Sequence, residues 1–132
     1  MEMTADQALG VIQHAVRKAR EIQVPMNIAV MDTGGHLKLF YRMEDAFVGS
    51  IDIAIGKART SMLFKMNSEA VGRFLDPEMR TFGMVNTNGG LVAFKGGMPV
   101  YQDGQIAAYI GVSGGSLDED FAVASAGSTG AY

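Results

Sequence analysis

Apolar residues recur every three or four positions near the start of the chain, which is the spacing of one helix face. They are Ala8, Ile12, Ala15, Ala19 and Ile22. Thr4 and Gln7 can form a capping box before this segment, since each side chain can bond the backbone amide of the other residue. Pro25 ends the segment because proline cannot continue a helix. The pattern predicts a first helix with one buried face.

Alternating apolar and polar residues then predict strands. Residues 26–31 and 37–42 lie on either side of an Asp-Thr-Gly-Gly turn and predict a hairpin. Two strand-like runs between residues 91 and 113 flank Asp103-Gly104, which supplies the positive φ of a tight turn. Residues 82–85 predict one further short strand. The sequence therefore predicts five strands.

The remaining helical segments are predicted from residue 50 to about residue 65, over 68–75, and from residue 117 to about residue 127. Ser116 and Glu119 form a second capping box before the last segment. Strands joined by tight turns must be antiparallel, and helices between the strand groups can cover both faces of a sheet. We predict an α+β fold: a single domain over residues 1–132, built as a profilin- or PAS-like α/β/α sandwich around one five-stranded antiparallel sheet.

Composition excludes several functions. The chain of 132 residues has a net charge of −3 and no basic run, which argues against nucleic acid as a partner. It has no cysteine, so disulfides, thiolate metal sites and a cysteine nucleophile are excluded. Apolar stretches are far shorter than the ~20 residues that span a membrane. No signal peptide is visible either, and we expect a cytoplasmic protein.

Several motifs along the chain resemble those of the GlcG/HbpS family, which includes the carboxy-terminal domain of PduO-type corrinoid adenosyltransferases. The motifs are IAVMDTGGHL at residues 28–37, RMEDA at 42–46, SIDIAIGKA at 50–58, GGMPV at 96–100 and GVSGG at 111–115. The resemblance implies a profilin-like fold, a homo-oligomer (dimer or octamer) and an accessory protein that binds haem or a related tetrapyrrole. It also implies a link to glycerol, propanediol or glycolate metabolism.

The chain departs from the usual family pattern at two places. Ala108-Tyr109 stands where the family more often has small residues, and Lys95 replaces a common proline. A bulky Tyr109 could fill a pocket that other members leave open.

Haem iron takes an axial donor such as histidine, and the chain has two histidines. His14 lies at the edge of the apolar face of the first predicted helix, where Arg17 or Lys18 could pair with a propionate. His36 directly follows a glycine pair. His14 is the candidate iron ligand, although a surface histidine at position 14 and a turn residue at position 36 are also consistent with the sequence.

An alternative ligand is a small hydroxy-acid anion. Backbone amides at a glycine-rich helix N-terminus can hold an anion, and a nearby lysine could add charge. The candidate residues are Lys57, Gly96, Gly97, Gly114, Gly115 and Ser116. Three acidic residues at positions 118–120 would compete with such an anion.

A third hypothesis is an assembly protein without a small ligand. Alanines at positions 122, 124 and 126, with Gly127 and Gly130, make the last predicted helix narrow enough for a neighbouring backbone to approach. No Ser-His-Asp order, HExxH, P-loop or GxGxxG motif is present. Catalysis has little direct support, so we favour a binding protein over an enzyme.

Overall fold

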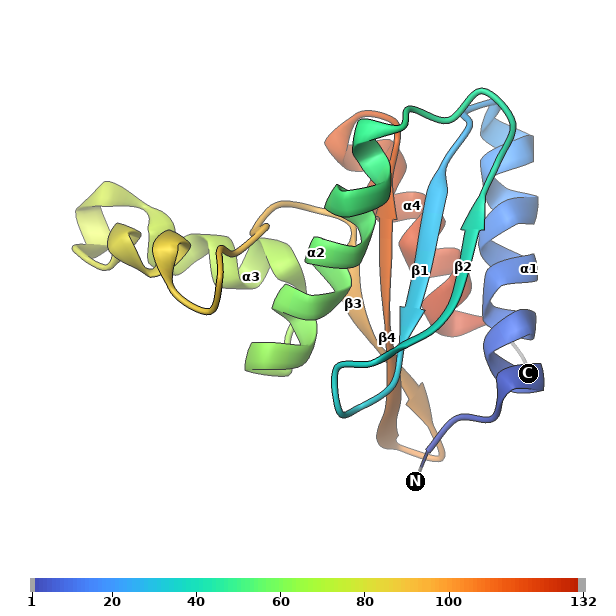
Figure 1. Ribbon diagram of the computed structural model, residues 1–132, viewed down its shortest axis with the longest axis horizontal. Helices are drawn as coiled ribbons and strands as arrows, with labels where there is room; N and C mark the ends of the chain where they lie inside the picture. Colours follow the sequence, from blue (N-terminus) through green and yellow to red (C-terminus); the bar gives the residue numbers. More distant parts are fainter. Residues whose placement is uncertain (1, 131–132) are drawn as a thin grey trace.

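The computed structural model describes residues 2–130, and their strands form one antiparallel sheet in the order β2-β1-β4-β3 (Figure 1). The strands are β1 (Asn27–Met31), β2 (Leu37–Arg42), β3 (Gly97–Gln102) and β4 (Gln105–Ser113). Helices α1 (Ala5–Ile22) and α4 (Leu117–Thr129) lie together on one face, and α2 (Gly49–Phe64) covers the other. The α/β/α layering is thus as predicted, with four strands in the described residues instead of five.

The fifth predicted strand, residues 82–85, is part of a 3-10 helix, η3 (Phe82–Asn86). Local bonds hold it: the amide of Met84 donates to the carbonyl of Thr81, and the amide of Thr87 donates to that of Met84, both at 2.9 Å. The prediction was wrong because a short apolar run does not by itself distinguish a strand from a helical turn. The strand predicted after residue 90 begins only at Gly97.

Local sequence signals place the two helices that share a face of the sheet. At α1, Thr4 accepts from the Gln7 amide at 3.1 Å and Gln7 accepts from the Thr4 amide at 2.9 Å. The predicted apolar face is buried against the sheet and α4, with Ile22 half-buried at its end. The capping box at α4 forms in the same way between Ser116 and Glu119.

The helix on the other face, α2, approaches the sheet closely at one point. A Cβ on Gly111 of β4 would collide with the backbone carbonyl of Ala54 in α2. Glycine is therefore required there for close packing between α2 and β4. This close approach brings the middle of α2 down to the centre of the sheet.

A projecting segment, which we call the arm (residues 73–90), leaves the layered body after α3 (Ser68–Gly72) (Figure 1). It contains η1 (Arg73–Leu75), η2 (Pro77–Met79) and η3, and none of its residues is buried. Four of its apolar side chains, Phe74, Met79, Phe82 and Val85, are 38–58% exposed. No helix within residues 2–130 is long and apolar enough to cross a membrane.

Candidate functional site

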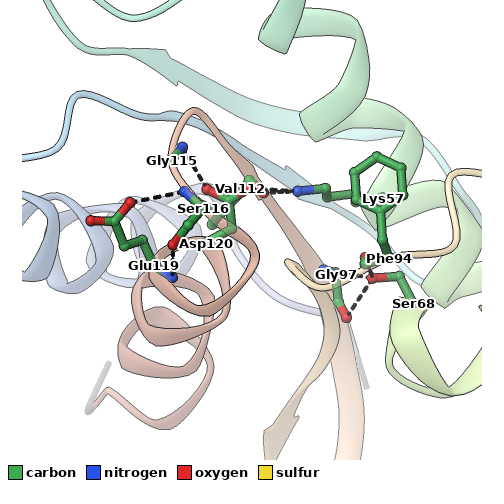
Figure 2. A network of polar contacts seen from close by, with 9 residues as sticks. All are labelled: Lys57, Ser68, Phe94, Gly97, Val112, Gly115, Ser116, Glu119 and Asp120. Carbon is green, nitrogen blue, oxygen red and sulfur yellow. Dashed lines mark hydrogen bonds and ion pairs between the residues drawn. The ribbon is translucent and has the colours of Figure 1, made fainter.

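Lys57 of α2 is fully buried, and its side chain reaches from α2 toward the end of β4 and the start of α4 (Figure 2). Its Nζ atom donates to Oδ2 of Asp120 at 2.8 Å and to the carbonyl of Val112 at 2.9 Å. The ring centroid of Phe94 lies 5.0 Å from the same nitrogen, within the range of a cation-π interaction. The ammonium group is thus surrounded by a carboxylate, a carbonyl and an aromatic ring.

Asp120, in the first turn of α4, uses both carboxylate oxygens in this network. Oδ1 accepts from the amide of Gly115 at 2.8 Å, while Oδ2 pairs with Lys57. The next amide, that of Ser116, donates to Glu119 at 2.8 Å. Two of the three amides that we considered for an external anion, those of Gly115 and Ser116, are therefore bonded to carboxylates of the chain itself.

The glycine pair before β3 forms one wall around Lys57. Gly96 has φ of 131°, and a Cβ there would lie 2.8 Å from the Lys57 nitrogen. Any other residue at this position would combine a strained backbone with a clash. The amide of Gly97 donates to Oγ of Ser68 at 2.9 Å, and that hydroxyl also donates to the carbonyl of Phe94 (Figure 2).

Gly114 lies at the bend between β4 and α4, with φ of 153° and its Cα facing Pro25 and Met26. The structure thus gathers six of the eight predicted site residues, from Lys57 to Ser116, around one buried ion pair or at its edge.

Burial lowers the pKa of Lys57 and raises that of Asp120, while the ion pair between them opposes both shifts. The pair joins α2 to α4 across β4.

The sequence prediction missed Asp120 as the partner of Lys57. A signal was available, because Asp120 stands three and four residues before Val123 and Ala124, which are buried in α4. Lys57 likewise follows Ala54 by three residues, on the buried side of α2. A charge on the buried side of a helix needs an opposite charge, so the two positions could have been matched.

The two histidines lie on different elements. His36 follows the β1–β2 turn with its side chain 82% exposed, and its Nδ1 lies 3.3 Å from Oδ1 of Asp32. That same oxygen accepts the backbone amides of His36 and Gly34, which together with the His36 ring lower the pKa of Asp32. His14 of α1 is half-buried and packs against Gly130 just after α4.

A hollow of about 780 Å³ lies between α1 and the edge strand β2. Its lining includes the apolar or aromatic residues Leu9, Ile12, Val16 and Tyr41, the two cations Arg17 and Arg20, and one acidic residue, Glu21. With two cations against one carboxylate, this lining has a net positive charge beside apolar walls, which suits a largely apolar ligand that carries carboxylates. His14 is not in the lining, but Arg17 lies one helical turn from it on a neighbouring face.

Residues 3–129 match the family model described as "Haem degrading protein HbpS-like", and the chain therefore belongs to this family. The chain is 36% identical over 119 residues to an uncharacterized 15.0 kDa protein of Citrobacter freundii from the dhaT-dhaS intergenic region. That match covers 89% of this chain and 84% of the relative. The family resemblance drawn from the sequence motifs is confirmed.

Solved structures agree with this assignment. The crystal structure of the Klebsiella pneumoniae protein ORFY superposes with a TM-score of 0.91 at 31% identity, covering 96% of this chain and 89% of that one. A structure described as the PduOC:heme complex superposes with a TM-score of 0.89 at 26% identity, covering 96% and 93%.

Proposed function

We propose that this protein is an accessory haem-binding protein, with His14 as the axial donor to the iron. The observation that carries the proposal is the likeness to PduOC, whose solved structure contains haem and whose fold this chain follows over 96% of its length. The family description, which names haem degradation, supports the same cofactor. A related tetrapyrrole would need the same kind of surface.

The residues along α1 fit such a ligand. Histidine nitrogen is a common axial donor for haem iron, and guanidinium groups pair well with carboxylates such as propionates. His14 and Arg17 are three residues apart on one helix, so both can reach a single ligand on its outer surface. Ile12 and Val16 of the neighbouring hollow stand two residues from His14 and face another side of α1, so the proposed contacts along this helix are those of His14 and Arg17. Bound haem supplies the iron chemistry; the chain supplies the donor and the charge.

The test is a haemin titration followed by absorbance. His36, the second histidine of the chain, provides a control for substitution of His14. We expect a saturable Soret band in the wild type and in His36→Ala, and loss of that band in His14→Ala and His14→Gln. Glutamine keeps most of the side-chain volume against Gly130, so it separates loss of the donor from loss of packing. A band that survives both His14 substitutions contradicts the assigned ligand. An unsaturable response in the wild type contradicts haem binding itself.

A homo-oligomer is the second part of the proposal, supported by the arm. Its exposed apolar side chains have no cover within the described chain, and its 3-10 helices contact mainly one another and α3. Contact with a second copy would remove this surface from water. Whether the assembly is a dimer or an octamer stays a prediction, as do the cytoplasmic location and the link to glycerol, propanediol or glycolate metabolism.

The alternative ligand, a small hydroxy-acid anion, was predicted to bind at the start of α4, where the groups expected to hold it already have partners within the chain. The Gly115 and Ser116 amides already have carboxylate partners, and Lys57 is bonded to Asp120. An external anion would have to displace two side chains of the protein. We therefore do not place a ligand at the start of α4.

A further inference from the structure

The last turn of the arm contains an asparagine followed by a glycine, Asn88-Gly89. These residues have φ of 54° and 77°, and the amide of Gly90 donates to the carbonyl of Thr87 at 2.8 Å, which closes a tight turn. Asn88 and Gly89 are both exposed, and a Cβ on Gly89 or Gly90 would meet no atom within 4 Å. The turn is therefore open to water and has room to change its backbone angles.

The amide nitrogen of Gly89 takes no part in closing this turn. It donates no hydrogen bond to any other residue in the range 2–130. Glycine has no side chain to shield this nitrogen, so it can approach the side-chain carbonyl carbon of Asn88. Once it has lost its proton, an amide nitrogen in this position is a nucleophile for that carbon.

Arg59 of α2 contacts the same peptide unit. Its Nη1 atom donates to the main-chain carbonyl of Asn88 at 2.6 Å, and this carbonyl is bonded to the nitrogen of Gly89. A cationic donor on the oxygen stabilises the negative charge that forms when the amide loses its proton. Arg59 is half-buried and forms no ion pair with an acidic side chain in residues 2–130. No carboxylate of that range therefore competes with the carbonyl for its charge.

The other asparagines of the chain lack this combination. Asn86 is also exposed in the arm, but the amide that follows it, that of Thr87, donates to the carbonyl of Met84 at 2.9 Å. Thr87 is also β-branched, which shields its nitrogen. Asn27 is buried in β1, and Asn67 is followed by a buried serine. Asn86 is therefore an internal control two residues from Asn88.

We propose that Asn88 is a site of spontaneous deamidation that Arg59 promotes. The Gly89 amide gives its proton to solvent, its nitrogen bonds to Cγ of Asn88, and Nδ2 takes up a proton and leaves as ammonia. The product of this step is a cyclic imide, which water then opens. Opening at Cγ gives aspartate, and opening at the main-chain carbonyl gives isoaspartate. The net reaction consumes one water molecule and releases one ammonia.

Isoaspartate is the product that the surroundings favour. In isoaspartate the former main-chain carbonyl of Asn88 becomes a free carboxylate, and this is the group that Arg59 already contacts. The contact becomes an ion pair. The product also adds one carbon atom to the main chain and one negative charge where the arm meets α2. The apolar side chains proposed for subunit contact end at Val85, so the reaction changes the attachment of the arm. The inference does not depend on haem binding.

The test is incubation of the full chain in mildly alkaline buffer, followed by peptide mapping with mass spectrometry. We expect deamidation at position 88, mainly to isoaspartate, while Asn86 stays unchanged. Arg59→Gln should slow the reaction at position 88 by about fivefold or more, which is the range of one hydrogen bond to a charged group. Arg59→Lys keeps the cation and should react at a rate between those of Arg59→Gln and the wild type.

The direction of the change separates promotion by Arg59 from simple anchoring of the turn. Loss of an anchor would free the turn and speed the reaction, whereas loss of a promoting cation slows it. In concentrated urea the contact is absent, so the wild type and Arg59→Gln should deamidate at equal rates. An Asn88 that reacts in urea but stays intact in the folded wild type would overturn the proposed site. A folded Arg59→Gln that reacts as fast as the wild type, or faster, would overturn the role of Arg59.

Discussion

The ion pair of Lys57 and Asp120 and the projecting arm are opposite exceptions to the usual distribution of side chains. The first puts charges in the core, with side chains 0% and 4% exposed, and the second puts large apolar groups in water. Every oxygen of the Asp120 carboxylate has a partner within the chain. The apolar groups of the arm have no comparable cover in the described residues.

This difference distinguishes interactions that stabilise the fold within one chain from surfaces that are available for contact with another chain. Buried charges persist only where their partners are built in. Exposed apolar patches on a folded protein commonly mark contact surfaces. We infer that the ion pair serves the fold of one subunit and that the arm serves contacts between subunits. The following three experiments test this division.

Lys57→Met should have the largest effect, because it leaves the Asp120 carboxylate buried without its cation. We expect a loss of about 3–5 kcal/mol in the free energy of unfolding, measured by urea denaturation at pH 7. The double variant Lys57→Met, Asp120→Leu should recover most of this loss, since it removes both charges. A single variant as stable as the wild type would contradict the role of the pair.

The pH dependence of the stability of Lys57→Met is a second test of the ion pair. Burial raises the pKa of Asp120, and Lys57 opposes that rise. Without Lys57 the folded protein takes up a proton on Asp120 at a higher pH than the unfolded chain does. Stability of Lys57→Met relative to the double variant should therefore increase as the pH falls through the folded pKa of Asp120.

Ser116→Ala should have an intermediate effect, because it removes the cap of the helix that carries Asp120. The Ser116 hydroxyl accepts from the amide of Glu119 at 3.2 Å. Loss of such a cap costs about 1 kcal/mol, which urea denaturation can resolve. Ser125→Ala, within the same helix, is the control and should change stability by less than about 0.5 kcal/mol. Equal losses in the two variants would argue against the cap.

Phe82→Ser in the arm should have the smallest effect on subunit stability, within about 0.5 kcal/mol, because the side chain is 58% exposed. It should nevertheless shift the protein toward smaller species in analytical ultracentrifugation, since it removes an apolar group from the proposed subunit contact. Phe47→Ser, 68% exposed but outside the arm, is the matched control and should sediment like the wild type. A monomeric wild type would contradict the proposed role of the arm.

Signals that act within a few residues predicted the fold well. The capping boxes at Thr4 and Ser116 and the turn at Asp103-Gly104 all appear in the structure. Each depends on residues close in sequence, so a single chain reveals it. The strand predicted at residues 82–85 fails for the opposite reason. Pairing requires a neighbouring strand, and that segment lies in the arm, away from the sheet.

The candidate site was predicted only in part, for the same reason. Glycine pairs and Lys57 were identified as one group, and the structure does bring them together. The anion beside them was expected to come from solution, but it is Asp120, from a distant part of the chain. A hollow of about 480 Å³, lined among others by Thr33, Met62 and Tyr109, could not be found from spacing, because it forms where the β1–β2 turn, the end of α2 and β4 meet.

The sheet order affects how the chain can fold as it leaves the ribosome. Among the four strands of residues 2–130, β1 comes first in the sequence, yet it lies between β2 and β4 in the sheet. Its hairpin partner β2 follows at once, whereas its other edge stays unpaired until β4 has been synthesised. During that interval the buried segment of residues 27–31 is an open, apolar edge that favours aggregation. Because Asp120 follows β4 in the chain, the ion pair forms only after that edge can be covered.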